Sequence, residues 1–184
     1  MYSLRADKHL EGEYQSVVIW RLQIEDRTKK NTIQPLKRSL FHKLSPRFFI
    51  QGPETYKIGE IRSTHENWTA DDDPALYDGL YIARAIPGNH KIYRLRIPFV
   101  LNSLAKNEWV DIPLDITITI PPDQLRFLGT FTIKNLQLVS WDKSPVFSYD
   151  MEFYKNDGTE AIRQFKQYYP EVYKQFQKTG PGMS

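Results

Sequence analysis

Residues able to act as nucleophiles or metal ligands are few in this chain. It contains no cysteine, which excludes disulfides, thiolate metal sites and cysteine nucleophiles. Its four histidines are His9, His42, His65 and His90, and no two of them have the i, i+4 spacing that places two imidazoles on one helical face. The Gly-x-Ser-x-Gly turn of many hydrolases and the glycine-rich loops that hold phosphates are also absent. The sequence therefore favours a protein without catalytic activity.

A cluster of carboxylates supplies the oxygen ligands that calcium prefers. Its members are Glu66, Asp71, Asp72 and Asp73. They lack the alternating Asp-x-Asp-x-Asp-Gly layout that wraps a loop around the ion, and Pro74 stiffens the end of the segment. We predict a solvated acidic loop over residues 65–76, with no metal and no cofactor. In the alternative, a metal-dependent enzyme, Asp71, Asp72 and Asp73 would surround a pocket together with His65 or His90.

The strongest chemical feature is a long basic connection over residues 25–47. Its apolar residues after Pro35 recur at helical spacing, which predicts a short amphipathic helix. Its basic residues are candidates for binding an anionic membrane surface, an anionic glycan or an acidic partner. These candidates are Lys29, Lys30, Lys37, Arg38, Lys43 and Arg47. The other interpretation is that the apolar stripe packs on the domain while the charges face water.

The composition favours a β-rich domain without a nucleic-acid partner. Aromatic residues make up 14% of the 184 residues, and aromatic and β-branched side chains suit pleated surfaces. The formal net charge of +3 is too small to indicate the row of phosphate contacts that nucleic-acid binding needs. No segment approaches the roughly 20 apolar residues of a membrane-spanning helix. The N-terminal segment has no apolar region typical of a signal peptide, so we expect it to be polar and mobile.

Period-two alternation predicts strands through the middle of the chain. The clearest face at residues 16–24 is formed by Val18, Trp20, Leu22 and Ile24, with Val17 and Ile19 on the opposite face. Further strands are expected in the segments 47–52, 55–63, 81–85, 91–97 and 146–154.

A Pro-Pro-Asp turn at residues 121–123 separates two more predicted strands. Isoleucine and threonine alternate over residues 116–120, and Phe127, Phe131 and Ile133 are expected to share one face after the turn. Gly129 would mark a bulge or a close contact. We predict a β-hairpin for this segment.

The C-terminal region predicts a helix. Asp157 and Glu160 have the spacing of a capping box, and the apolar stripe that follows is Ala161, Ile162, Phe165, Tyr168 and Tyr169. Pro170 ends or kinks this helix. We predict one mainly β domain over residues 16–178, an antiparallel β-sandwich of about seven or eight strands with a long basic insertion and a C-terminal helix at about 158–177. Residues 1–15 would be a flexible segment and residues 179–184 a disordered tail.

Three segments resemble prealbumin-like, or carboxypeptidase-regulatory-like, β-sandwich domains of bacterial exported lipoproteins. "GLYIARAIPGNHKI" is similar to their Pro-Gly turn, with Pro87 and Gly88 at the turn and His90 where a tyrosine is usual. "ITITIPPDQLRFLGTFTI" is similar to the hairpin that follows, with Phe127 and Gly129 at its aromatic and glycine positions. "DGTEAIRQFKQYYPEVY" resembles their closing helix. The resemblance covers residues 77–173.

The resemblance implies a prealbumin-like sandwich in an exported protein tethered by an N-terminal lipid, an anchor whose cysteine this sequence lacks. We therefore expect the non-catalytic, soluble portion of a bacterial cell-envelope lipoprotein, acting as a binding or structural module. Its partner would be the membrane surface, an envelope protein or a glycan. Two alternatives stay open: an envelope hydrolase or metal-dependent enzyme, and a cytosolic β-rich adaptor.

Overall fold

The computed structural model describes residues 2–3, 16–27, 45–53, 58–69, 74–101, 106–141, 145–155 and 158–178. These residues form ten strands and two helices. The strands are β1 (Tyr2–Ser3), β2 (Ser16–Asp26), β3 (Arg47–Gln51), β4 (Ile58–Arg62), β5 (His65–Thr69), β6 (Ala75–Ala85), β7 (Gly88–Leu101), β8 (Lys106–Ile120), β9 (Leu125–Trp141) and β10 (Pro145–Tyr154). The helices are α1 (Thr159–Tyr168) and α2 (Pro170–Lys178).

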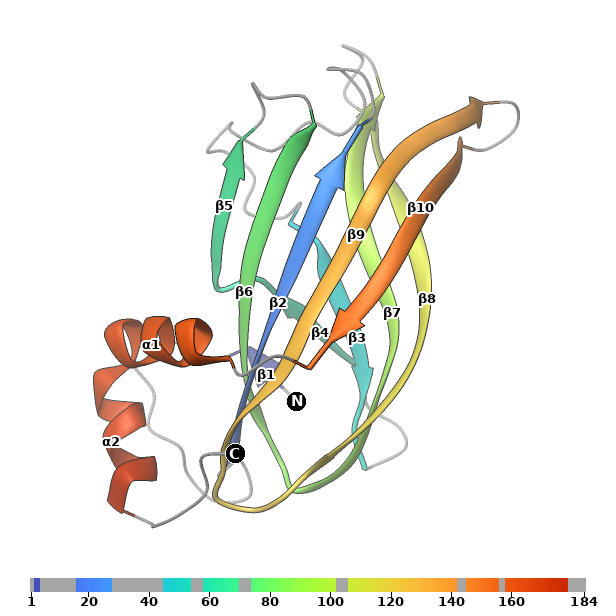
Figure 1. Ribbon diagram of the computed structural model, residues 1–184. Coiled ribbons are helices and arrows are strands. Elements are labelled where there is room, and N and C mark those ends of the chain that lie inside the picture. The colour runs from blue at the N-terminus through green and yellow to red at the C-terminus, as the bar shows by residue number, and fades with distance from the viewer. Residues whose placement is uncertain are drawn as a thin grey trace.

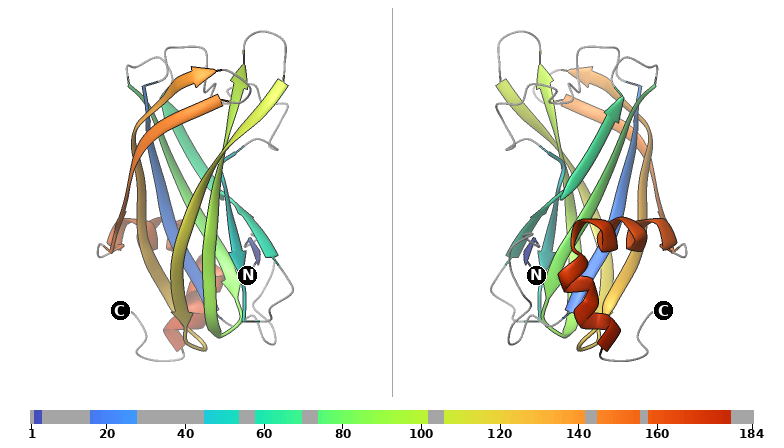
Figure 2. Two further views of the ribbon diagram at one scale, coloured as in Figure 1. Left: turned by 90° about the vertical axis from the view of Figure 1, so that its right-hand side faces the viewer. Right: turned by 90° about the vertical axis from the view of Figure 1, so that its left-hand side faces the viewer.

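The strands form two sheets that pack face to face, which confirms the predicted β-sandwich class (Figure 1). Sheet A has the order β1-β6-β2-β9-β10, with β5 also paired to β6, and sheet B has the order β4-β3-β7-β8. The pairing is antiparallel except between β2 and β9, which run parallel. The side views show both layers and the strong twist between them (Figure 2).

Strand β2 contributes one face to the core between the sheets, and its side chains alternate between the two faces as the sequence predicts. Val18, Trp20, Leu22 and Ile24 point into the main core, whereas Val17 and Ile19 lie on the outer face of sheet A. At the centre of the core, Trp20 stacks on Tyr81, with ring centroids 5.5 Å apart and an interplanar angle of 14°. Phe48 of sheet B packs edge-on against both rings, which joins the two sheets.

Two short helices cover one end of the outer face of sheet A (Figure 2, right). Buried Phe165 and Tyr169 pack there with Val17 and Ile19, so the start of β2 is apolar on both faces. The single C-terminal helix predicted from the sequence is broken at Pro170 into α1 and α2. The N-cap of α1 is Gly158 without a side-chain cap, so the predicted capping box does not form. Neither helix is long and apolar enough to cross a membrane.

The two proline-containing turns carry the chain from one sheet to the other. Pro87 and Gly88 connect β6 of sheet A with β7 of sheet B, and Gly88 has a φ of 121°, as a glycine turn requires. The turn at residues 121–123 likewise connects β8 of sheet B with β9 of sheet A. The predicted β-hairpin is therefore wrong, because β8 pairs with β7 and β9 pairs with β2 and β10. Turn chemistry indicates a reversal of direction but not the partner of the strand that follows.

A bulge in β9 corrects a second prediction. The register of β9 against β2 shifts between the pairs Ile19–Phe127 and Trp20–Gly129, and Gly129 has a φ of 137°. The extra residue reverses the alternation, so Phe127 packs beneath the helices while Phe131 faces the main core. Phe127 and Phe131 therefore do not share a face, although the prediction of a bulge and close contact at Gly129 is confirmed.

Two strands were not predicted. Residues 65–69 form β5 at the edge of sheet A rather than the start of a loop, and Tyr2–Ser3 pair with β6. A strand such as β5, with polar residues His65, Glu66 and Asn67, has too little apolar alternation to be recognised from sequence. The rest of the predicted N-terminal segment, the helix after Pro35, the Asp71–Asp73 loop and the tail at residues 179–184 lie outside the described residues.

Candidate functional site

The structure describes one of the six predicted basic binding residues. Arg47 is the first residue of β3, whereas Lys29, Lys30, Lys37, Arg38 and Lys43 lie outside the described residues. Phe48 and Ile50 point from β3 into the core, so Arg47 and Phe49 lie on the opposite, outer face of sheet B. The basic connection thus ends on the outer face of this sheet.

Three arginines lie in register across three neighbouring strands of that face. Arg47 is directly opposite Arg62 of β4 on one side and Arg96 of β7 on the other. Asp111 of β8 continues the row beyond Arg96. Neighbouring strands are roughly 4.8 Å apart, and like charges directly opposite each other destabilise a sheet. We call this outer face, with Arg47, Arg62, Arg94 and Arg96, the arginine face.

Two carboxylates are shared among these four arginines. Arg96 donates to both oxygens of Asp111, Nε to Oδ1 at 2.7 Å and a terminal nitrogen to Oδ2 at 2.8 Å, while Arg94 lies 3.7 Å from Oδ2. Glu60 accepts from Arg47 at 3.1 Å and from Arg62 at 2.8 Å. These four arginines and two carboxylates leave a net charge of +2 on the described part of the face, which the separate ion pair of Lys91 and Asp115, at 2.8 Å, does not change.

The pKa values of the charged groups follow this arrangement. Desolvation lowers the pKa of Arg47, Glu60 opposes that effect, and the charges of Arg62 and Arg96 lower it further. Hydrogen bonding between Arg96 and Asp111 raises the pKa of the guanidinium and lowers that of the carboxyl. Arg47, Arg96 and Asp111 remain charged at neutral pH, so they can bind ions but are not suited to transfer protons.

Aromatic rings hold the guanidinium groups against the sheet. Arg94 lies over Phe49 with its central carbon 4.1 Å from the ring centroid, and Arg47 lies over Trp109 at 4.6 Å. Arg96 lies between the same two rings, 5.4 Å from Phe49 and 5.8 Å from Trp109. Stacking fixes a guanidinium without using its N–H donors, which lie in the plane of the group.

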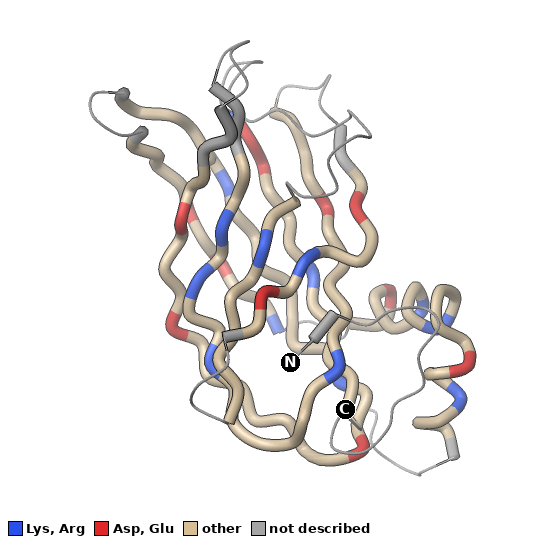
Figure 3. Tube along the Cα trace, turned by 180° about the vertical axis from the view of Figure 1, so that it is seen from behind, with Lys and Arg blue, Asp and Glu red and all other residues tan. Residues whose placement is uncertain are grey.

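Seen from the side of sheet B, basic positions recur on adjacent strands with fewer acidic positions between them (Figure 3). No exposed large hydrophobic side chain of the described residues lies on this face. The exposed ones are Leu76, Val139, Val146, Tyr154 and Tyr168, all in sheet A or α1. The arginine face is therefore cationic, and its aromatic side chains Phe49 and Trp109 are only partly exposed.

Sequence reasoning found Arg47 but missed the other three arginines of the face. Arg94 and Arg96 stand two residues apart in "RLRI", and Arg62 lies near the end of a predicted strand. Arginines at these positions of predicted strands indicate cations on the outer face of a sheet. Only the pairing of the strands, which sequence did not supply, shows that the four side chains lie together.

The two histidines of the alternative metal or hydrolase site lie on different sheets. His65 lies at the edge of sheet A and stacks on Tyr168 of α1, with ring centroids 3.7 Å apart. His90 is buried in β7 of sheet B, where its Nε2 donates to the carbonyl of Ile86 at 2.9 Å. Among the residues that the structure describes, no group of three His, Asp or Glu side chains could hold a metal ion. Asp71, Asp72 and Asp73 are not among them.

Comparison with protein-family models, with curated proteins and with solved structures found no match for this chain.

Proposed function

We propose that this protein is a non-catalytic binding module of the bacterial cell envelope that binds an anionic glycan on the arginine face. The observation that carries the proposal is the row of Arg62, Arg47 and Arg96, three like charges in register on adjacent strands. Such a row costs stability within the sheet, so its presence favours a role in binding.

Several features favour a glycan over an acidic protein or a membrane. Protein interfaces are built around a prominent apolar or aromatic anchor, whereas the rings of Phe49 and Trp109 on this face are only partly exposed and lie beneath arginines. Arginines repeat at the strand spacing of roughly 4.8 Å, which suits a flat chain with regularly repeated carboxylates or sulfates. The guanidiniums stacked on Phe49 and Trp109 are preorganised, which reduces the entropy lost on binding.

Binding to polygalacturonate, followed by titration calorimetry at several salt concentrations, tests the proposal. We expect saturable binding that weakens as salt increases. Replacing Arg62 and Arg94 by glutamine should weaken it about tenfold or more, because each replacement removes a charge-assisted contact. Arg163→Gln is the matched control, since Arg163 is an exposed arginine on α1, remote from sheet B.

Other outcomes would assign the face differently. Binding of anionic phospholipid vesicles or poly-glutamate, but not of the glycan, would replace the proposed ligand by a membrane or an acidic protein. A triple variant with Lys37, Arg38 and Lys43 changed to glutamate tests whether the basic connection also contributes to binding of the anionic glycan. Absence of any salt-sensitive ligand would contradict the proposal.

The envelope location is a separate part of the proposal and is supported by the sequence resemblance. Expression of the native reading frame in its own host, detergent partitioning and an intact mass would test it. A diacylglyceryl mass on an upstream cysteine supports a lipoprotein, whereas an unmodified soluble chain supports the cytosolic adaptor. A rise in melting temperature with Zn²⁺ or Ca²⁺ would instead favour the metal-dependent enzyme.

A further inference from the structure

The outer face of sheet A has a cleft of about 370 Å³ beyond the part that the helices cover. Four polar side chains lie in register across its floor, each on a different strand. In order they are Asn67 of β5, Asp78 of β6, Gln23 of β2 and Thr132 of β9. At the usual strand spacing the row is ~14 Å long. It therefore presents two amides, a carboxylate and a hydroxyl along one line.

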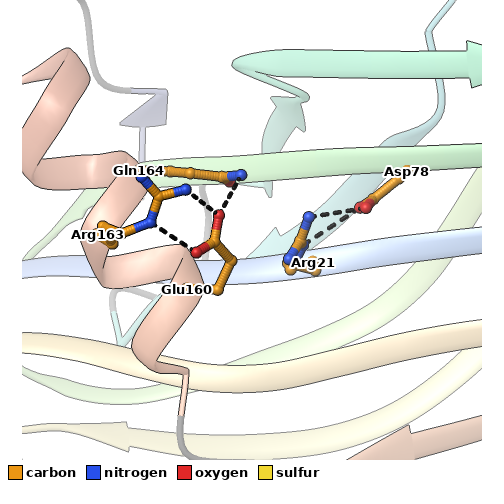
Figure 4. A network of polar contacts seen from close by, with 5 residues as sticks. All are labelled: Arg21, Asp78, Glu160, Arg163 and Gln164. Carbon is orange, nitrogen blue, oxygen red and sulfur yellow. Dashed lines mark hydrogen bonds and ion pairs between the residues drawn. The ribbon is translucent and has the colours of Figure 1, made fainter.

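Asp78 is held in place by a bidentate contact with Arg21, whose Nε and terminal nitrogen donate to the two carboxylate oxygens at 3.2 and 2.7 Å. Figure 4 shows this pair beside the separate network of Glu160, Arg163 and Gln164 on α1. Arg21 thus separates the helix-covered end of sheet A from the cleft. A carboxylate with one fixed partner keeps lone pairs free and is a preorganised acceptor.

The charged groups that line the cleft are already paired, whereas three of the neutral ones are not. Glu25 accepts from Arg27 at 2.7 Å, and Lys134 donates to Glu152 at 2.7 Å. Within the described residues, the side chains of Gln23, Asn67 and Thr132 form no hydrogen bond. A charged ligand would have to break ion pairs, while a neutral ligand would use donors and acceptors that are free.

We infer that the cleft is a binding site for a neutral oligosaccharide lying across strands β5, β6, β2 and β9. Hydroxyl groups both donate and accept hydrogen bonds, so they match the mixed amides, carboxylate and hydroxyl of the row. Leu76, which is 50% exposed in the adjacent row, offers an apolar contact for the C–H face of a sugar ring. The volume is within the range of small-ligand sites. This site is separate from the arginine face, which lies on the other sheet.

Titration of the isotope-labelled full chain with cello-, malto-, xylo-, manno- and N-acetylchito-oligosaccharides, observed by NMR, tests the inference. We expect saturable binding of at least one of these probes, with shifts of the side-chain amide signals of Gln23 and Asn67. Gln23→Ala and Asn67→Ala should each weaken that binding about tenfold, because each removes a hydrogen bond to the sugar. Both residues are exposed, so the melting temperature should not change.

Two control variants show whether sugar binding takes place in the cleft. Gln137→Ala removes an exposed amide of β9 that does not line the cleft and should leave sugar binding unchanged. The Arg62→Gln, Arg94→Gln variant should also bind normally, so failure of the arginine-face proposal would not affect this result. The inference would be overturned if no neutral probe bound, or if Gln23→Ala and Asn67→Ala bound the sugar as tightly as the parent protein does.

Discussion

Two imidazoles that are shielded from water make the stability of this protein dependent on pH. Burial lowers the pKa of His65 and of His90 below the ordinary value of 6.5. As the pH falls below 6.5, the unfolded chain takes up protons that the folded chain does not bind. Stability that is complete above pH 6.5 is therefore lost as the pH falls from 6.5 towards the folded-state pKa.

The variant His90→Gln tests this account. Glutamine retains a donor for the carbonyl of Ile86 but cannot be protonated. We expect the loss of unfolding free energy between about pH 7.5 and about pH 5 to be smaller in His90→Gln than in the parent, measured by urea denaturation. An equal loss in the two proteins would show that His90 is not a source of the pH dependence.

At Gly129 both the backbone conformation and the surrounding atoms require glycine. Its φ of 137° is rare for other residues, and an added Cβ would collide with the carbonyl oxygen of Tyr154. We expect Gly129→Ala to destabilise the protein by about 2 kcal/mol or more, measured by chemical denaturation. Gly52→Ala is the matched control, because its Cβ would meet the His90 ring at an ordinary 3.6 Å. Similar losses of unfolding free energy in Gly129→Ala and Gly52→Ala would show that position 129 does not specifically require glycine.

At the scale of elements, the helix pair is attached to sheet A mainly by apolar contacts. Phe165 is fully buried, and its ring packs against those of Tyr169 and Tyr173. Phe165→Ala should cost about 3–5 kcal/mol, because it removes a large buried ring and leaves a cavity. Hydrogen exchange should show the greatest loss of protection in α1 and α2. Gln167→Ala, at an exposed position of α1, should have little effect.

The arginine face gives a prediction in which stability and binding diverge. Arg62 is directly opposite Arg47, so Arg62→Gln removes a like-charge neighbour and an exposed contact with Glu60. The melting temperature should stay the same or rise slightly, while binding of the anionic glycan weakens. A large fall in melting temperature would show that Arg62 is retained for structure.

Local patterns in the sequence predicted elements better than they predicted contacts between elements. The alternation in β2 assigned Val18, Trp20 and Leu22 to one face because β2 pairs with β6 without any shift of register. The same reasoning failed for Phe127, since one extra residue in β9 reverses the face. The hairpin failed for a different reason: a turn between sheets and a turn within a sheet use the same residues. The cleft row was not predictable, because its four residues belong to strands distant in the sequence.

At the scale of the molecule, the two outer faces differ in chemistry. The face of sheet B carries more stacked arginines than carboxylates, whereas the charged side chains that line the cleft of sheet A are ion-paired and the described Gln23, Asn67 and Thr132 side chains form no hydrogen bond. The sandwich core that separates them is rigid and apolar. We therefore expect substitutions on the two faces to act additively on ligand binding.

The central position of β2 has a consequence for how the protein is made. Of the long strands that the structure describes, β2 is synthesised before the others, yet it lies between β6 and β9, and its first residue contacts Gln124, 108 residues later. One edge of this apolar strand can pair with β6 once Ala85 has emerged, but the other stays open until β9 has been made, which delays cooperative folding and exposes the nascent chain to aggregation. A chain stalled before Leu125 should remain bound to chaperones, whereas one stalled after β10 should resist protease.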